Sequence, residues 1–470
     1  MARNVETPPP PALLDETERE RRAAHAEELL PALHDQGVVG VAVTWVDHSG
    51  ITRVKAVPLA RLPHAAGWGI GASPVFDAFL TDDSIVAGRH AGGPVGDLRL
   101  LPDLGRLTVL DQQPGWSWAP ADRYTQTGAP HVQDQRSLAR RAVASLADAG
   151  FTAQVAFEVE WAVGVPGENF VPAVSGPAYG YTRLVEQSDY LRDLLVALNR
   201  QQVRVEQIHP EYSSGQFEIS VAVEGPVAAA DTLVLVRETI RAASARHGLR
   251  ATFSPKMVAD GAGNGGHVHL SMWRGATNLF AAGSELLGLT PEATAFTAGI
   301  LNRLPALLAV GAPSPASYLR LIPQHWAGAF QAWGLENRET ALRIVQGSTG
   351  DQHRAANLEV KAFDLAANPY LVVAALLFAG LAGLAEGATL PEPVHVDPAS
   401  LSEAERTDRG IAALPTDVMT ATAAFEADAA LTSAFGAELA ATIADVRRAE
   451  AARFADAEPG DIVAGVLWKF

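Results

Sequence analysis

The sequence has 470 residues, of which 48% are hydrophobic and 19% charged. This composition is typical of a globular protein with a large core, and it excludes wholesale disorder and collagen-like repeats. Acidic side chains outnumber basic ones by 53 to 36, and the net charge of -17 argues against a nucleic-acid or anionic-membrane surface. Because there is no cysteine, any metal must be held by histidines and carboxylates.

The first part of the chain is predicted to form a small β-rich domain. Residues 1–15 are polar and rich in proline, which predicts a disordered arm without a secretory signal and therefore a cytoplasmic protein. Helical spacing follows over 16–36. Strand-like segments then occur at 38–46, 51–57, 98–101 and 107–110. The turn-rich stretch 113–133 marks the end of this domain, so we predict one domain over 16–125 and a second over 126–470.

In the second domain, helical and strand-like segments alternate. Helices are predicted over 137–149, 189–201, 229–247 and 291–308, and in the alanine-rich tail 402–456. Strands are predicted over 151–163, 203–208, 216–223, 249–258, 267–273, 341–345 and 358–363. Consecutive strands around 211–223 and 267 favour an antiparallel sheet, and hence an α+β fold, over a doubly wound parallel sheet.

An uncharged, mostly apolar run covers the 15 residues 371–385. It is too short to span about 30 Å of hydrocarbon. Asn368 and Pro369 before it have the residue types of an N-cap and a first helical position. We therefore predict a buried core helix and no membrane partner.

Acidic residues occur inside predicted strands, where a buried carboxylate is costly without a compensating cation or donor. Alternation sends Glu158 and Glu160 to the same face of an apolar strand. An exposed polar edge would explain this pair alone. Two further acids, Glu211 and Glu218, flank a glycine turn, and this recurrence favours a site.

A glycine-rich loop over 260–266 precedes a strand in which His267, His269 and Ser271 share one face. The loop lacks the Gly-Lys-Ser/Thr ending of a phosphate-binding loop, so by itself it is a weak indication. Alternating histidines and a serine directly after it nevertheless indicate a functional site.

Cationic side chains gather farther along the chain. Four arginines fall within 35 mostly apolar positions, with an acid and a lysine just beyond: Arg320, Arg338, Arg343, Arg354, Glu359 and Lys361. Surface salt bridges are the simpler explanation, but the planar guanidinium suits phosphates and carboxylates. Acids and histidines for divalent ions, together with arginines for phosphates, indicate a nucleotide-dependent ligase or kinase.

Five ordered blocks resemble the glutamine synthetase family. They are residues 158–160, 211–218, 254–256 with 265–271, 337–343, and 367–371. The resemblance runs from about residue 38 to 385. It implies a small β-grasp N-terminal domain and a large catalytic domain on a curved antiparallel sheet. It also implies a homo-oligomer, a dodecamer of two hexameric rings with active sites between subunits.

The resemblance also implies ligands and a reaction. Two to three divalent ions, Mg²⁺ or Mn²⁺, are expected, one held by Glu160, Glu211 and Glu218 and another by Glu158, His267 and Glu359. The implied reaction has two steps: the γ-carboxylate of L-glutamate attacks ATP, and a primary amine then displaces phosphate from γ-glutamyl phosphate.

Further roles follow from the same resemblance. His269 and Ser271 match positions that contact ATP, and Arg338 and Arg343 match arginines that hold the phosphates and the phosphoryl group in transfer. Gly265, Arg320 and Lys361 match positions at or near the bound glutamate.

Two departures from the family concern the amine site. The loop that carries an ammonium-binding aspartate in glutamine synthetases has Gly71 and no Asp here, and Trp326 stands where the family's flap offers a Glu. We therefore predict a γ-glutamyl-amine ligase for a small organic amine such as ethanolamine, and next for a polyamine. The alternatives are an ammonia-using glutamine synthetase and a catalytically silent scaffold or sensor. The full set of metal ligands argues against the silent protein.

Overall fold

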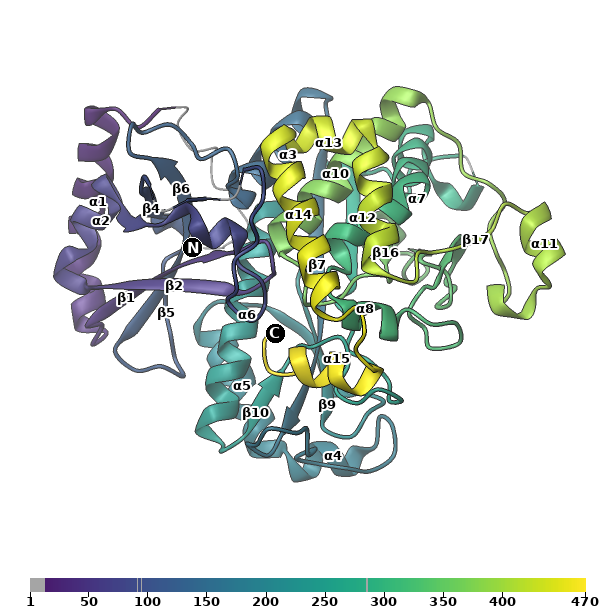
Figure 1. Cartoon of the computed structure of the whole chain (residues 1–470), viewed down its shortest axis with the longest axis horizontal. Helices are drawn as coiled ribbons and strands as arrows, with labels where there is room; N and C mark the ends of the chain where they lie inside the picture. Colours follow the sequence, from purple (N-terminus) through teal and green to yellow (C-terminus); the bar gives the residue numbers. More distant parts are fainter. Residues whose placement is uncertain (1–12, 91, 94, 285) are drawn as a thin grey trace.

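The computed structural model describes residues 13–90, 92–93, 95–284 and 286–470. Most of the arm predicted to be disordered, residues 1–12, lies outside the described residues. The described chain contains two main β-sheets, the smaller one in the N-terminal part and the larger one beside it with its helices (Figure 1). This architecture confirms the predicted α+β class.

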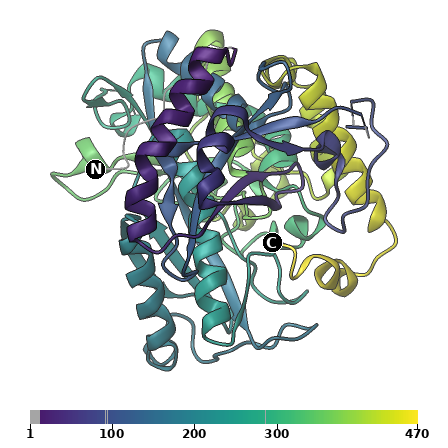
Figure 2. The ribbon, with the colours of Figure 1, turned by 90° about the vertical axis from the view of Figure 1, so that its left-hand side faces the viewer.

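The N-terminal sheet has the strand order β2-β1-β6-β4-β3, with β5 paired to β6. Its strands are β1 (Gly40–Val46), β2 (Thr52–Pro58), β3 (Ile70–Ala72), β4 (Leu98–Pro102), β5 (Thr108–Val109) and β6 (Trp116–Thr125). Helices α1 (Glu16–Asp35) and α2 (Leu62–Trp68) pack together beside it, with α1 in front in Figure 2. The side chain of Asp15 caps α1 by accepting a hydrogen bond from the Glu18 N–H at 2.9 Å.

The stretch 113–133, predicted to consist of turns, contains the ten-residue strand β6. In the structure, Asp122 accepts a hydrogen bond from Arg136 at 2.7 Å, and Arg123 donates to Asp77 at 2.6 Å. The prediction was wrong because these partners come from distant segments, and pairing with them allows the charges to be buried.

The larger sheet has the order β14-β15-β16-β11-β7-β9-β8, with β10 on β7 and β12 on β11. Its strands are β7 (Thr152–Gly164), β8 (Val205–Pro210), β9 (Gln216–Val221), β10 (Arg250–Thr252), β11 (Val268–Arg274), β12 (Thr277–Asn278), β14 (Trp333–Leu335), β15 (Leu342–Val345) and β16 (Asn357–Val360). Its pairings are antiparallel except β14 with β15. The strand predicted over 249–258 is only three residues long, because the chain leaves the sheet before Ser254–Pro255 and enters the glycine-rich loop.

Helices cover the larger sheet, and α3 and α6 contact β7 directly. The helices of this part are α3 (Gln135–Asp148), α4 (Tyr181–Glu186), α5 (Ser188–Arg200), α6 (Pro226–Arg246), α7 (Pro291–Gly311), α8 (Pro315–Arg320), α9 (Gln352–Ala355) and α10 (Pro369–Glu386). The tail contains α11 (Glu403–Asp408), α12 (Val418–Ala427), α13 (Ala429–Phe435), α14 (Ala437–Arg453) and α15 (Pro459–Val466). Strand β17 (Ala412–Ala413) pairs with β13 (Phe330–Gln331).

Helix α10 is the buried core helix predicted from the apolar run. Asn368 caps it by accepting hydrogen bonds from the N–H groups of Tyr370 and Leu371. Helix α10 ends at Glu386, one residue after the predicted run, and both α7 and α10 are long and apolar enough to cross a membrane by length and composition. So, taken together, is the bent pair of α13 and α14. In α7 and α10, 72% and 67% of the apolar window is buried inside the protein, and the two helices pack on each other.

A buried ionic cluster joins the two parts of the chain. Arg136 of α3 donates to Asp103 and Asp122 from the N-terminal part, each at 2.7 Å, and to both oxygens of Asp231 on α6, at 2.9 and 2.8 Å. All four side chains are almost fully buried. The guanidinium therefore connects the two parts at a point from which solvent is excluded.

Candidate active site

The register of three neighbouring strands places Glu160, Glu218 and His209 side by side. Glu160 of β7 is paired with Glu218 of β9, which is paired with His209 of β8, and paired residues project from the same face of a sheet. Glu211 follows β8, and ligand atoms of His209, Glu211 and Glu218 all lie within 4.8 Å of one another. In this group His209 stands in the place of Glu160, which the resemblance assigned to the same metal ion as Glu211 and Glu218. The carboxylate of Glu160 accepts the N–H of Gly265 at 2.8 Å.

This first group carries an excess of negative charge. Burial, followed by the charge of Glu160, raises the pKa of Glu211 to about 7. Burial also raises the pKa of Glu218. The hydrogen bond to Glu218 raises the pKa of His209 to about 9, so the ring supplies one positive charge. A divalent cation would relieve the remaining repulsion.

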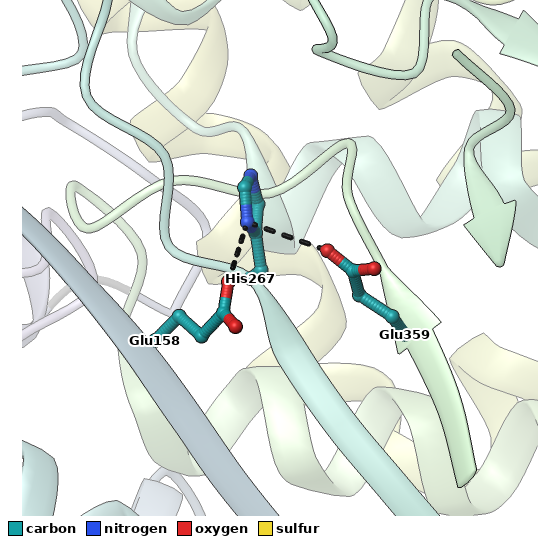
Figure 3. A group of neighbouring side chains, drawn as sticks. All are labelled: Glu158, His267 and Glu359. Carbon is teal, nitrogen blue, oxygen red and sulfur yellow. Dashed lines mark hydrogen bonds and ion pairs between the residues drawn. The ribbon is translucent and has the colours of Figure 1, made fainter. Parts of the chain in front are cut away.

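The second group is Glu158, His267 and Glu359, shown in Figure 3. His267 Nδ1 lies 3.0 Å from Glu158 Oε2 and 3.5 Å from Glu359 Oε1. These residues come from β7, from the residue before β11, and from β16, which are adjacent strands in the order β16-β11-β7. The structure thus brings together the three residues that the resemblance assigned to one metal ion.

Cations surround the second group. Glu359 lies opposite Arg343 on β15 and His269 on β11. It accepts hydrogen bonds from Arg343 and from Lys361, each at 2.9 Å. Burial alone would raise the pKa of Glu359, but the charges of Lys361, His269 and His267 outweigh it and lower the pKa to about 2. Glu359 is therefore held as a carboxylate.

Both groups suit hard divalent cations. Their donors are carboxylate oxygens and imidazole nitrogens, which Mg²⁺ and Mn²⁺ accept as ligands. Burial and then the charge of Glu160 raise the pKa of Glu211, and such an ion would stabilise its carboxylate form. Two ions at these groups would supply positive charge to stabilise a phosphoryl group in transfer.

Both groups open into one cavity of about 760 Å³. Of the predicted site residues, those that line it are Glu158, Glu160, Glu211, Glu218, His267, Arg320, Trp326, Arg338, Arg343 and Lys361. The cavity is therefore acidic at the two groups, and its lining also contains three arginines and two lysines.

Two arginines are available to an anionic ligand. Arg320, the last residue of α8, is buried and donates to the carbonyl oxygen of Lys361 at 2.9 Å. Its Nη1 is buried and has no hydrogen-bond partner among the described residues. The guanidinium of Arg338 has no ion-pair or hydrogen-bond partner at all within the described part of the chain. Unpaired guanidinium groups at a cavity are suited to carboxylates and phosphates.

Five predicted residues are not among those that line the cavity. Glu359 lies in the second group, and His269 Nε2 lies 3.2 Å from Glu158 Oε1. The hydroxyl of Ser271 accepts a hydrogen bond from the indole of Trp273 at 2.8 Å. Gly71 lies on β3 of the N-terminal sheet. The assignments of His269 and Ser271 to ATP and of Gly71 to the amine site stay predictions.

The fifth of these, Gly265, lies where the backbone approaches both groups. A Cβ atom at this position would lie 2.6 Å from His267 Nε2, 2.8 Å from Glu160 Oε1 and 3.0 Å from Arg320 Nη2. We expect Gly265→Ala to lower kcat/KM by about tenfold to a hundredfold, because the added methyl group would displace the side chains of His267 and Glu160 from their positions in the site. Gly460→Ala is the control, since its Cβ would meet nothing within 4 Å. Equal activity of the two variants would contradict this placement.

Sequence reasoning missed several residues that line the cavity. They are Tyr179, Gln207, His209, Tyr212, Gln216, Lys256, Ala262, Gly263, Gln324 and His325. His209 lies in β8 and Gln216 in β9, where strand alternation was a usable signal, whereas Tyr212 lies in the turn between these strands. Tyr179 comes from the loop before α4 and carried no such signal.

Comparison with known proteins agrees with this site. The model of the glutamine synthetase catalytic domain matches residues 132–461, and that of the glutamine synthetase N-terminal domain matches residues 30–133. The chain belongs to the glutamine synthetase family, and it is a glutamate–amine ligase.

Three proteins of known name or structure are similar to this chain over almost its whole length. The gamma-glutamylpolyamine synthetase of Streptomyces coelicolor is 56% identical over 449 residues, which cover 95% of this chain and 96% of that protein. A crystal structure described as a novel glutamine synthase homologue superposes with a TM-score of 0.83 at 31% identity, covering 93% of this chain and 99% of the other. The complex of GmaS with ADP has a TM-score of 0.81 at 29% identity, with 92% and 97% covered.

Proposed function

We propose that this protein joins the γ-carboxylate of L-glutamate to a primary amine of a polyamine, using ATP. The observation that carries the choice of amine is the 56% identity, over almost the whole chain, to a protein named gamma-glutamylpolyamine synthetase. The net charge of -17 also favours a polycationic substrate. The first preference from sequence, ethanolamine, rested on two lost carboxylates and has no support from these relatives.

The proposed reaction has two steps, and the cavity supplies cationic groups for phosphoryl transfer. In the first step a γ-carboxylate oxygen of glutamate forms a bond to the terminal phosphorus of ATP, and ADP leaves. In the second step the amine nitrogen attacks the acyl carbon, phosphate leaves, and the nitrogen loses a proton. We assign Arg320 to the substrate carboxylate and Arg338 and Arg343 to the phosphoryl oxygens, and the position of all three in the cavity lining supports this assignment.

Arg338 provides a test of phosphoryl binding. We expect Arg338→Lys to lower kcat by about tenfold to a hundredfold, with the KM for glutamate changed less than about twofold, because a point charge cannot replace bidentate contacts. Arg354→Lys is the control, since Arg354 is exposed and pairs only with Asp351 among the described residues. A raised KM for ATP with unchanged kcat would instead assign Arg338 to ground-state binding.

A panel of amines tests the substrate. Phosphate release from ATP with glutamate is measured for spermidine, putrescine, ethanolamine, monoamines and ammonium, and the amide products are identified. We expect the highest kcat/KM with a polyamine and negligible glutamine formation. Equal rates with ammonium would favour an ordinary glutamine synthetase, a maximum with ethanolamine would restore the small-amine prediction, and no product with any amine would favour a silent protein.

We also propose that the protein is a homo-oligomer, a dodecamer of two six-membered rings. In such a ring the β3 segment with Gly71 would face the cavity of a neighbouring subunit, which would account for the absence of Gly71 from the lining of the cavity in its own chain. The mass in solution, measured by light scattering, tests the assembly. A monomer with full activity would contradict it.

A further inference from the structure

A row of aromatic side chains lines one wall of the cavity. His209 and Tyr179 are stacked with ring centroids 5.2 Å apart, and Tyr179 and Tyr212 lie edge to face at 5.7 Å. Tyr212 and Trp326 lie edge to face at 5.2 Å. All four residues line the cavity. The aromatic row, as we call these four, thus runs from the first metal-binding group to the loop that carries Trp326.

Hydrogen bonds hold three of these residues in place. The hydroxyl of Tyr179 donates to Glu211 Oε1 at 2.5 Å, and the backbone N–H of Tyr212 donates to Glu211 Oε2 at 3.0 Å. The backbone N–H of Trp326 donates to the carboxylate of Glu339 at 3.1 Å. Tyr179 and Trp326 also have positive φ angles of 56° and 53°. Such conformations are uncommon outside glycine and collect at ligand sites.

The rings are open to a ligand despite these contacts. Tyr179, Tyr212 and Trp326 are 51%, 46% and 43% exposed. A group of large exposed aromatic side chains at a cavity marks a binding surface. An aromatic face attracts an ammonium group through its quadrupole, and the same ring buries methylene groups.

The geometry points to the aromatic row as the subsite for the carbon chain and the distal ammonium group of the amine substrate, an inference that rests on the proposed function. The reacting nitrogen lies at the metal-binding end, and the chain extends along the rings toward Trp326. The ring faces of Tyr212 and Trp326, at the far end of the row from the protonated His209, take the place of carboxylates in binding the second cation. The loss of the family's Glu at position 326 is therefore compatible with a polyamine.

The length of the row makes the inference specific. Successive centroids are more than 5 Å apart, so a two-carbon amine reaches only the inner rings, whereas a longer diamine also reaches Tyr212 and Trp326. Binding should therefore improve as the chain grows. Removing an outer ring should weaken long amines and spare short ones.

The experiment compares Tyr212→Leu and Trp326→Leu with the parent over unbranched diamines of two to five carbons, spermidine and ethylamine. For each variant and the parent, kcat/KM for spermidine is divided by kcat/KM for the shortest amine that serves as a substrate. We expect this ratio to fall about tenfold in the Leu variants, mainly because the KM for spermidine rises. This corresponds to an ammonium–ring contact of about 1.4 kcal/mol. The KM for glutamate should stay within about twofold of the parental value, and the rate with the shortest amine should fall less than the rate with spermidine. Tyr212→Phe and Trp326→Phe should restore the ratio because each keeps a ring.

The control is Tyr181→Leu, because Tyr181 is an exposed tyrosine near Tyr179 that does not line the cavity. If diamines and spermidine are good substrates but the Leu variants keep the parental ratio, the aromatic row is not the subsite and the proposed function stands. If the Leu variants lose all amines equally while melting like the parent, the rings serve the reaction in general and the inference is overturned. If the parent uses no diamine or polyamine, the proposed function itself fails.

Discussion

Replacing Glu218 with glutamine is expected to lower kcat by about 10³-fold while leaving the fold intact. Glu218 stands between Glu160 and His209 in the row across three strands. Glutamine keeps the shape but removes a charge that the divalent ion requires. A metal ion contributes several kcal/mol of charge stabilisation to phosphoryl transfer, and each 1.36 kcal/mol is worth a factor of ten in rate.

This prediction has a readout besides activity. Burial raises the pKa of Glu218, which shows that its charged form is disfavoured in the metal-free protein. Glu218→Gln should therefore melt at the same or a higher temperature without metal, while the increase in melting temperature on adding Mg²⁺ should shrink. Glu206→Gln on β8 is the control, because Glu206 is exposed and pairs with Arg204 at the surface. An unchanged response to Mg²⁺ would show that Glu218 is not a ligand.

Replacing Arg136 with methionine is expected to destabilise the protein by about 3–5 kcal/mol, which is typical when one partner of a buried ion pair is removed. Arg136 is bound by Asp103, Asp122 and Asp231. Methionine fills similar volume but leaves the three carboxylates without this guanidinium. Chemical denaturation measures the loss.

The control for Arg136 is Arg192→Met. Arg192 is exposed and pairs with Asp189 and Asp193 on the surface of α5, where such pairs contribute about 0–1 kcal/mol. We expect the two variants to differ by several kcal/mol. Similar stabilities would show that the cluster does not join the two parts of the chain.

The same cluster predicts a loss of stability in acid. Burial alone would raise the pKa of Asp103, but the charges of Arg136 and Arg140 outweigh it and lower the pKa to about 2. A carboxyl whose pKa is lower in the folded state stabilises the fold above its unfolded pKa of about 3.9. This contribution should be lost as the pH falls from about 4 toward 2. Melting curves across this range check it, and Asp103→Asn should flatten the dependence.

Elements whose formation depends on neighbouring residues could be predicted from the sequence. The N-cap at Asn368, the proline that follows it and the apolar run predicted α10. Period-two alternation placed Glu158 and Glu160 on one face of β7, and both line the cavity. These predictions held because capping and alternation act within a few residues along the chain.

Elements that depend on distant partners were missed or shortened. Strand β6 was taken for turns. Its charged residues Asp122 and Arg123 can be buried in a strand only because they pair with Arg136 and Asp77. The strand predicted over 249–258 ended early, because after Thr252 the chain turns away into the loop over the cavity.

The sequence by itself determined the resemblance to a family, the α+β class and half of the residues that line the cavity, because these follow from residue type and local spacing. Only the tertiary structure decided which of those residues meet. The pairing of β8 with β9 brings His209 to Glu218, and the loop before α4 brings Tyr179 to Tyr212. Strand register and loop paths result from packing among segments far apart in the chain, so spacing along the sequence carries no record of them.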